Sequence, residues 1–293
     1  MSFGPHLFLA LLEGTVTAFV LALTALGLSL VFGVMRVVNV AHGEFFMLGA
    51  VLAWWCTSLV GPSPLLGFLL AMVVAPVAVA AIAVVADWAV LRRIDYNPES
   101  TIVATIGLLY IIQQLVLTFF GPEARPVEAP IYFRVQFPWF GYSGYKLIVA
   151  GLSGVLLLGT WFLMVRSKLG LYMRATQQDA ETARTFGVPT KSVYSKVFAI
   201  GAGLAALAGV LVVPIRQADY LMGLEPLLLS FIVVIIGGLG SLRGTLVAAF
   251  IVGISDGFIS VFYEPTLAKM LATVLVAAVL VLKPTGLFGE ETR

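Results

Sequence analysis

The sequence predicts an all-α fold, a polytopic bundle of eight to ten transmembrane helices. Hydrophobic residues make up 60% of the 293 residues and charged residues only 11%, whereas about a quarter of a soluble domain is charged. A water-soluble domain of this length could not cover its surface with so few charges. The apolar residues also gather in runs of about 20, which is the length that crosses about 30 Å of hydrocarbon as a helix. We therefore expect one transmembrane domain over residues 1–293.

Nine apolar runs account for the expected bundle. They are residues 8–33, 43–60, 65–91, 101–120, 146–165, 194–215, 226–240, 244–262 and 266–282. The runs that begin near Gly43 and Leu227 are short or interrupted, so the predicted number of spans extends from eight to ten. No basic segment precedes the first run, and we expect no removable signal peptide.

The first interruption of the apolar pattern is a broken helix near residues 33–45. It places Asn39, His42 and Glu44 within six residues, between two apolar runs. An ionised carboxylate at the bilayer centre costs about 2.5–3.5 kcal/mol. We therefore expect these three side chains to line or border a translocation path, because a broken helix directs polar groups toward a cavity. The alternative is that Asn39 and Glu44 cap the next helix.

The second interruption is the glycine-rich segment of residues 237–244. Gly237, Gly238, Gly240 and Ser241 are the residues that we assign to the translocation path here. Glycines permit a tight turn and close backbone approach, and no Lys-Ser or Lys-Thr pair follows them as a phosphate loop would require. Both interruptions are expected on the same side of the membrane.

Basic residues predict the orientation of the bundle. With residues 166–196 in the cytoplasm, twelve Lys and Arg residues lie inside and five outside. The inside set is Arg36, Arg92, Arg93, six residues of the loop, Arg243, Lys283 and Arg293; the outside set is Arg125, Arg134, Lys146, Arg216 and Lys269. We expect the N-terminus outside and the C-terminus in the cytoplasm.

The longest external segment is predicted at residues 121–144. Its four prolines prevent a helix over most of its length. Its aromatic side chains are typical of the headgroup level of a membrane. The segment could receive a soluble partner or simply cover the bundle at the interface, and both interpretations stay open.

The cytoplasmic loop of residues 166–196 predicts a short helix. Thr176 is the expected N-cap, with Asp179 at the third helical position. Gly187 is expected to end the helix and Pro189 to prevent its continuation. Small and apolar side chains share one face, which a groove on a partner protein could accept. They are Ala180, Ala183 and Phe186. The alternative is an ordinary positively charged cytoplasmic loop.

Small residues dominate the span that follows this loop. Spacings such as Ala205-xxx-Gly209 let neighbouring helix backbones approach closely. We expect these residues to serve helix packing rather than chemistry.

Four stretches resemble one family of membrane proteins. They are Gly27–Gly49, Gly170–Gly187, Ile232–Gly244 and Leu282–Gly289. On these motifs the chain resembles, over nearly its full length, the permeases of ABC importers for branched-chain amino acids. The resemblance implies a subunit of the bacterial inner membrane that pairs with a second permease, either a paralogue or a second copy. Two cytoplasmic ATPase subunits would drive the pair, and a periplasmic substrate-binding protein would deliver the substrate.

The resemblance also implies which residues couple transport to the ATPases. The Ala183-xxx-Gly187 element is similar to the importer motif that docks on the ATPase, and Arg174, Ala175 and Asp179 fit its upstream part. The family's Glu-Ala-Ala run is replaced here by Glu181-Thr182-Ala183. The chain carries no nucleotide-binding motif of its own. The sequence therefore predicts a transport subunit rather than an enzyme, with ATP on the partner subunits and no cofactor in this chain.

Other functions are weighed against this one. An ion-coupled secondary transporter would use Glu44, Asp87 and Asp256 as relay groups. An intramembrane enzyme would use His42 and Glu44, but no nucleophile or metal constellation surrounds them, and the histidine pair of a helical metal site is missing. Within the same family, urea, short amides or aromatic acids are alternative substrates. The net charge of +2 does not indicate nucleic acid.

Overall fold

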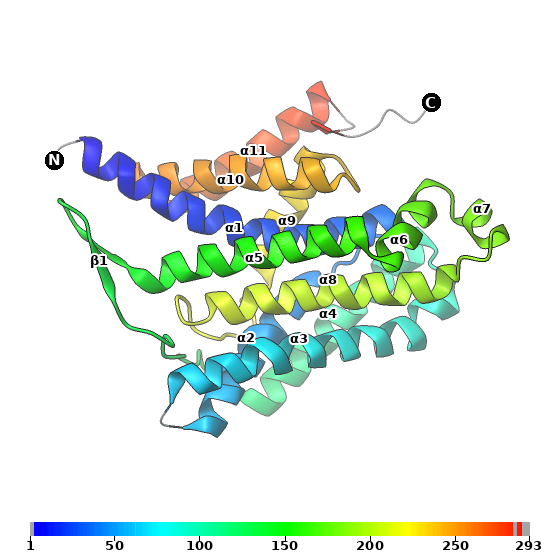
Figure 1. Ribbon diagram of the computed structural model, residues 1–293, viewed down its shortest axis with the longest axis horizontal. Coiled ribbons are helices and arrows are strands. Elements are labelled where there is room, and N and C mark those ends of the chain that lie inside the picture. Colours follow the sequence, from blue (N-terminus) through cyan, green and yellow to red (C-terminus); the bar gives the residue numbers. More distant parts are fainter. Residues whose placement is uncertain (1–2, 62, 284–285, 289–293) are drawn as a thin grey trace.

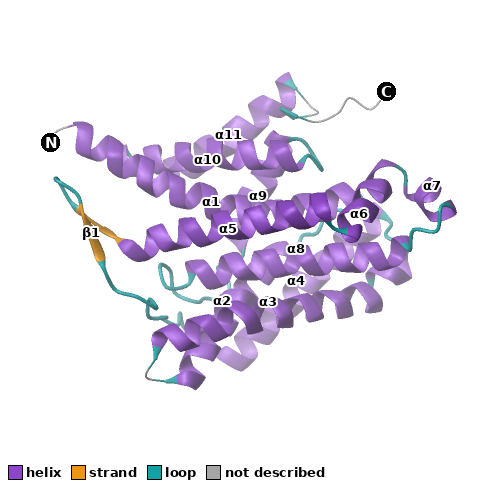
Figure 2. Ribbon diagram, in the orientation of Figure 1, coloured by secondary structure: helices purple, strands orange, loops and turns teal. Residues whose placement is uncertain are grey.

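The computed structural model describes residues 3–61, 63–283 and 286–288, and within them the chain is almost entirely helical (Figure 2). The helices are α1 (Phe3–Met35), α2 (His42–Val60), α3 (Pro64–Ala89), the 3-10 turn η1 (Leu91–Ile94), α4 (Pro98–Phe120), α5 (Gly144–Arg166), α6 (Lys168–Gln178), α7 (Ala180–Thr185), α8 (Thr190–Val212), α9 (Leu224–Gly237), α10 (Leu242–Phe262) and α11 (Pro265–Leu282). Two short strands, β1 (Arg134–Gln136) and β2 (Gly141–Ser143), pair antiparallel.

Each of the nine predicted apolar runs coincides with a helix, so the predicted helix bundle is confirmed. Within the described residues, seven helices are long and apolar enough to cross a membrane; the apolar stretches of α9 and α11 are shorter. Several boundaries differ from the prediction. Helix α1 begins at Phe3 rather than at residue 8. Helix α9 ends at Gly237 rather than at residue 240, because Gly238 has a φ of 101° and no right-handed helix can continue through it.

Helices α1 and α8 form the centre of the bundle. The most apolar stretches of α1 and α8 are 83% and 78% buried, whereas those of α3, α4 and α5 are 22–28% buried. Small residues make this close packing possible, as predicted. A Cβ atom on Gly27 of α1 would lie 2.6 Å from the carbonyl oxygen of Gly201 in α8, and one on Gly209 would lie 2.0 Å from the carbonyl oxygen of Phe46. Helices α3, α4 and α5 therefore present exposed apolar faces on the outside of the bundle.

The first helix break is narrower than predicted and carries the chain back into the bundle. Helix α1 continues to Met35, and Arg36 reverses the chain with a φ of 55°. Residues 36–41 are not α-helical, and α2 begins at His42. The His42 Nε2 atom lies 2.9 Å from the carbonyl oxygen of Thr24. Thr24 is about three turns before the end of α1, about 16 Å along its axis, so α2 begins deep inside the bundle.

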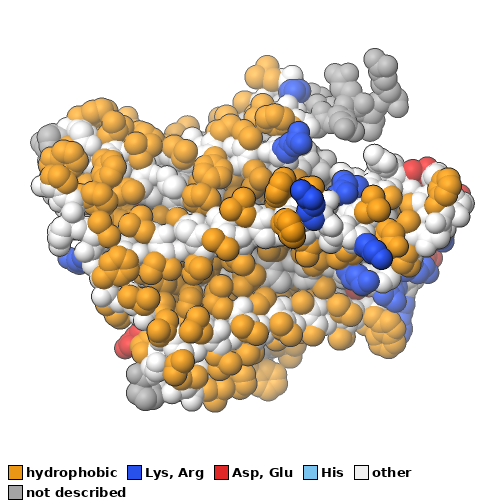
Figure 3. Space-filling model, in the orientation of Figure 1, with side chains coloured by type: hydrophobic (Ala, Val, Ile, Leu, Met, Phe, Trp, Pro, Cys, Tyr) orange, Lys and Arg blue, Asp and Glu red, His pale blue; other side chains and the backbone are white. Residues whose placement is uncertain are grey.

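The two ends of the bundle differ in structure and in charge. The N-terminal end of α1 and the β1–β2 hairpin lie at one end, and α6 and α7 lie at the other (Figure 1). In the view of Figure 3, Lys and Arg side chains gather toward the α6–α7 end and apolar side chains cover the middle. The residues between α4 and α5 are not helical, as the prolines predict, although the hairpin was not expected. Arg293 and Gly289, which entered the predictions, lie outside the described residues.

Candidate functional site

The predicted single helix of the 166–196 loop is wrong, because two helices divide the segment. Thr176 is not an N-cap. It lies inside α6, and its hydroxyl donates to the carbonyl of Tyr172 at 2.7 Å. Asp179 is the N-cap of α7 instead. Its Oδ1 accepts from the backbone N–H groups of Glu181 and Thr182 at 2.9 and 3.0 Å. Extended backbone at Asp179 ends α6, and the short carboxylate satisfies the first free N–H groups of α7.

The exposed carboxylate of Asp179 is well stabilised in its ionised form. The Thr182 hydroxyl donates to its second oxygen. Together with the backbone N–H of Thr182, this bond lowers the pKa of Asp179 below its usual value. Thr182 therefore adds a side-chain hydrogen bond to the cap of α7.

Helix α7 ends as the sequence predicts, but its predicted docking face is divided. Gly187 has a φ of 84°, and the N–H of Val188 bonds to the carbonyl of Ala183 at 3.0 Å, as in a glycine C-cap. Ala183 is only 6% exposed and Phe186 is 85% exposed. Ala183 therefore packs against its own chain, and Phe186 is the apolar side chain that projects into solvent.

The remaining predicted coupling residues hold α6 against the end of α5. The Arg174 side chain donates to the carbonyl of Met164, in the last turn of α5, where a positive charge is favourable. The carbonyl of Ala175 accepts from the N–H of Asp179 at 3.2 Å. Arg174 and Ala175 thus fix the base from which α7 projects.

Gln177, at the end of α6, joins both helix breaks. Its backbone carbonyl accepts from Arg36 Nη2 at 3.3 Å, and its side-chain amide donates to the carbonyl of Gly240 at 3.1 Å. Gly33 and Gly240 also touch, since a Cβ atom on Gly33 would lie 3.1 Å from the Cα atom of Gly240. The two breaks therefore lie on the same side, as predicted. We call Gly33, Arg36, Gln177 and Gly240 the junction.

The glycine-rich segment beside the junction is a tight turn between α9 and α10. Gly238 and Gly240 have φ values of 101° and 81°, which other residues rarely adopt. A Cβ atom on Gly237 would lie 2.4 Å from the carbonyl carbon of Gly244, so only glycine fits there. The Ser241 hydroxyl accepts from the N–H of Gly244 at 3.2 Å and caps α10.

The end of the chain binds to the same turn. The N–H groups of Leu287 and Phe288 donate to the carbonyls of Ile236 and Gly237 at 2.8 and 3.2 Å. These carbonyls belong to the last turn of α9, where a helix leaves acceptors free. All four stretches that carry the family resemblance therefore contribute residues at or next to the junction.

Asn39, His42 and Glu44 are all buried rather than turned toward lipid. None is more than 1% exposed. Asn39 Oδ1 accepts from the N–H of Ala41 at 3.1 Å, and Glu44 Oε1 accepts from the Gln113 amide at 2.9 Å. Glu44 lies in the first turn of α2, as the capping alternative expected, but no side chain makes a capping hydrogen bond at the start of this helix. The Glu44 Oε2 atom has no hydrogen-bond partner among the described residues.

The starts of α2 and α9 meet inside the bundle. A Cβ atom on Gly43 would lie 2.2 Å from the carbonyl oxygen of Gly223, and one on Gly223 would lie 2.3 Å from the carbonyl oxygen of Gly43. Two helices that begin inside the bundle and touch at glycines at their N-terminal ends resemble the broken helices of transporters. The sequence predicted helix starts near Gly43 and Leu227, within three residues of those observed, but it did not predict that the two starts would touch.

Comparison with known proteins gives the family. The family model described as the branched-chain amino acid transport system permease component matches residues 10–282. The chain belongs to this permease family.

The relatives of the permease match it over nearly its full length. It is 26% identical to the high-affinity branched-chain amino acid transport system permease protein BraD of Pseudomonas aeruginosa, over 97% of this chain and 96% of the relative. The corresponding protein LivH of Escherichia coli is 25% identical over 92% and 91%. A probable LivH of Methanocaldococcus jannaschii is 24% identical over 97% and 93%. No solved structure matches the chain. The predicted resemblance is confirmed, and the chain is a multi-pass transport permease.

The three carboxylates of the relay alternative do not share one set of neighbours in the permease. Asp87 is buried and pairs with Arg92 at 3.0 Å and with the Ser195 hydroxyl. Glu44 binds Gln113, and Asp256 interacts electrostatically with Glu225. Among the described residues there is no group of three His, Cys, Asp or Glu side chains that could hold a metal ion.

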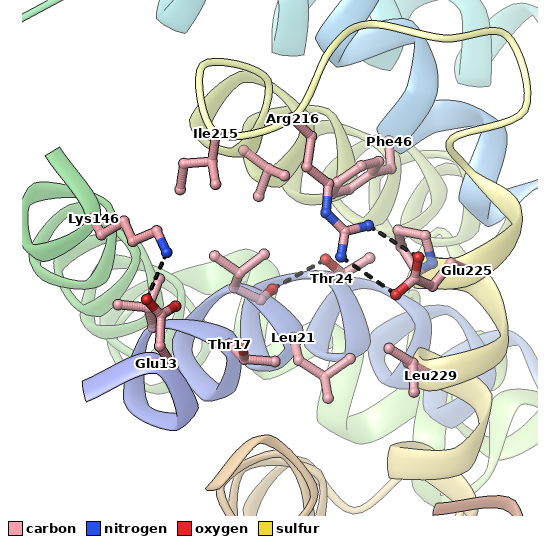
Figure 4. A pocket seen from close by; sticks show the side chains of 14 residues that line it. Glu13, Thr17, Leu21, Thr24, Phe46, Lys146, Ile215, Arg216, Glu225 and Leu229 are labelled. Atoms are coloured by element: carbon pink, nitrogen blue, oxygen red, sulfur yellow. Dashed lines mark hydrogen bonds and ion pairs between the residues drawn. The ribbon is translucent and has the colours of Figure 1, made fainter. Parts of the chain in front are cut away.

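A cavity of about 190 Å³ lies in the half of the permease that contains the N-terminal part of α1 (Figure 4). Two ion pairs line it: Glu13 with Lys146, and Glu225 with Arg216. Its residues are Glu13, Val16, Thr17, Val20, Leu21, Thr24, Phe46, Lys146, Val212, Ile215, Arg216, Glu225, Pro226 and Leu229. Lys146 and Arg216 were both expected outside, but the site that they line was not predicted. Isolated charged residues within or beside apolar runs were the available signal.

Proposed function

We propose that this permease is the membrane-spanning subunit of an ABC importer for branched-chain or related aliphatic amino acids. It pairs with a second permease, a paralogue or a second copy, in the inner membrane. Two cytoplasmic ATPase subunits bind ATP and dock on α6–α7, and a periplasmic binding protein delivers the amino acid. The N-terminus lies outside and the C-terminus in the cytoplasm, an orientation supported by the basic side chains that gather at the α6–α7 end.

The junction is the observation that carries the proposal. Helix α7 lies between α6 and α8 in the chain. On the α6 side, Gln177 at the end of α6 binds both Arg36 and Gly240. These two residues belong to the two helix breaks. A partner that pulls on α7 would therefore act on both breaks together, which is what an ATP-driven permease requires.

Phe186 is the residue that we assign to the ATPase groove. Its exposed ring projects from the end of α7, and large apolar side chains of this kind anchor partner grooves. Ala183 and Gly187 shape the helix behind it. Aliphatic amino acids as the substrates are supported by the names of the three relatives, which are all branched-chain amino acid permeases or probable ones.

The test uses the native complex, purified through this permease and reconstituted in vesicles with the binding protein. We expect ATP-dependent uptake of L-leucine and a tenfold or greater loss with Phe186→Ala, together with weaker retention of the ATPase. Phe119→Ala is the matched control, because Phe119 is 77% exposed on α4, away from α6–α7. Uptake that needs an ion gradient and no ATPase subunit would overturn the proposal.

A further inference from the structure

One ion pair lies on each of two opposite sides of the cavity in Figure 4. Lys146 Nζ lies 2.6 Å from Glu13 Oε1 on one side. Across the cavity, Arg216 Nη1 and Nη2 lie 3.0 and 3.3 Å from the two carboxylate oxygens of Glu225. These four charges sum to zero, and Lys269 and Asp256, which lie near Glu225, add one charge of each sign. A neutral molecule that itself carries both charges complements both sides of such a site, whereas a net anion or cation would complement only one of them.

In each ion pair, one residue has a second partner and stays compensated when the ion pair opens. Glu225 Oε1 lies 3.1 Å from Lys269 Nζ, so Glu225 keeps a cation when Arg216 turns away. Lys146 Nζ lies 5.7 Å from the centre of the Tyr142 ring, so Lys146 keeps a cation–π contact when Glu13 turns away. Arg216 and Glu13 are therefore the two groups that are free to bind a ligand.

The surface between the two ion pairs is apolar. Val20 and Leu21 of α1, Phe46 of α2 and Leu229 of α9 line it. The volume of about 190 Å³ compares with the roughly 150 Å³ of an apolar cavity that binds benzene. The site therefore suits a small ligand with one short aliphatic or single-ring side chain.

The inner wall of the cavity contacts the start of α2. Thr24 lines the cavity, and its backbone carbonyl lies 2.9 Å from His42 Nε2 at the start of α2. Glu225, the second residue of α9, lies beside the Gly43–Gly223 contact. A molecule in the cavity thus touches the two helices that begin inside the bundle.

We propose that this cavity is a substrate site for a zwitterionic α-amino acid with an apolar side chain. The Arg216 guanidinium binds the α-carboxylate through its planar pair of donors. Glu13 accepts from the α-ammonium group, and the side chain lies against Phe46 and Leu229. The site rests on the proposed function, and one permease chain supplies all of it.

The test measures binding of radiolabelled L-leucine to the intact transporter complex in lipid nanodiscs, without the binding protein. Isocaproate lacks the ammonium group of leucine and isoamylamine lacks its carboxylate. Both should compete at least tenfold less well than leucine on the wild-type complex. Glu13→Gln should weaken leucine binding about tenfold and abolish the preference over isocaproate. Arg216→Gln should do the same for the preference over isoamylamine.

Matched controls separate binding from structure. Glu123→Gln and Arg134→Gln make the same changes at exposed residues outside the cavity, and should leave both preferences unchanged. Arg216→Lys keeps the charge but loses the planar fork, and should give an intermediate affinity. Subunit stoichiometry is measured in every sample.

Two results would overturn the site: no leucine binding by a wild-type complex that takes up leucine, or unchanged preferences in Glu13→Gln and Arg216→Gln. Either leaves the importer function standing. If the wild-type complex binds leucine but shows no ATP-driven leucine uptake, the proposed function is wrong instead.

Discussion

The side-chain amide of Gln113 in α4 donates to Glu44 Oε1 in α2 at 2.9 Å. This bond ties α4, which has an exposed apolar face, to the first turn of a helix that begins inside the bundle. Glu44 therefore has one oxygen with a fixed donor and a second oxygen without a partner among the described residues. The free oxygen can accept a group that arrives when the breaks move.

We expect Glu44→Gln to lower transport without preventing assembly. Glutamine keeps an acceptor oxygen for Gln113 but removes the negative charge from the first turn of α2. Leucine uptake in vesicles is the measurement, with ATPase stoichiometry checked in the same sample. Gln113→Leu is the companion variant. It leaves a buried acceptor unsatisfied at a cost of roughly 1–3 kcal/mol, and should lower the melting temperature of the complex. Full uptake by Glu44→Gln would leave Glu44 with a structural role only.

The Gly43–Gly223 contact should tolerate no added methyl group. Gly223→Ala places a Cβ atom 2.3 Å from the carbonyl oxygen of Gly43, and overpacking of this kind costs about 1–3 kcal/mol or more. We expect a lower melting temperature and less assembled complex. Gly107→Ala is the control, since no atom lies within 4 Å of its Cβ position. Equal stability of the two variants would show that the two helix starts are not in contact in the assembled complex.

Gln177→Ala should separate ATP hydrolysis from transport. The substitution removes the side-chain bond to Gly240 and keeps the backbone bond to Arg36. One such bond contributes about 0.5–1.5 kcal/mol, so the amount of leucine moved per ATP should fall up to about tenfold. The neighbouring Gln178→Ala is the matched control, because the structure gives its side chain no described hydrogen bond. An unchanged ratio of uptake to hydrolysis in Gln177→Ala would remove the junction from the mechanism.

Acid should loosen α7 through its cap. The pKa of Asp179 is lower in the folded protein than in the unfolded chain. Its stabilising contribution is therefore complete above the unfolded value of about 3.9 and is lost as the pH falls through the lower folded value. Hydrogen exchange of α7 amides should rise as the pH is lowered below about 4, relative to the exchange expected for an unstructured peptide. Asp179→Ser keeps a cap that does not titrate, and its relative exchange should not change with pH.

The sequence was sufficient to predict the nine apolar helices and the two breaks, because long apolar runs and clustered glycines act locally, but it did not predict the division of residues 166–196 into α6 and α7. Residues 237–244 are a turn for the reason that the sequence suggests: Gly238 and Gly240 adopt backbone conformations that other residues avoid. The ends of α1 were less predictable, since polar residues such as His6 continue a helix without adding to its hydropathy.

Contacts between segments that are far apart in the chain could not be predicted from the sequence. Nothing near Gln177 indicates that it binds Arg36 and Gly240. Thr176 resembled an N-cap because a threonine with an acidic residue three positions later fits a capping box, but Asp179 competes for the same role and its extended backbone decides. Glu13 and Arg216 are far apart in the chain, so only the folded bundle reveals that they face one cavity.

The cavity lies wholly within one chain, and this has a consequence for stoichiometry. A transporter built from two copies of this permease would hold two equivalent amino-acid sites, so saturation binding should give two leucine molecules for each pair of permeases. A transporter built from this permease and a paralogue would hold two different sites. If the paralogue has other residues at the positions of Phe46 and Leu229, the two sites would prefer amino acids with different side chains.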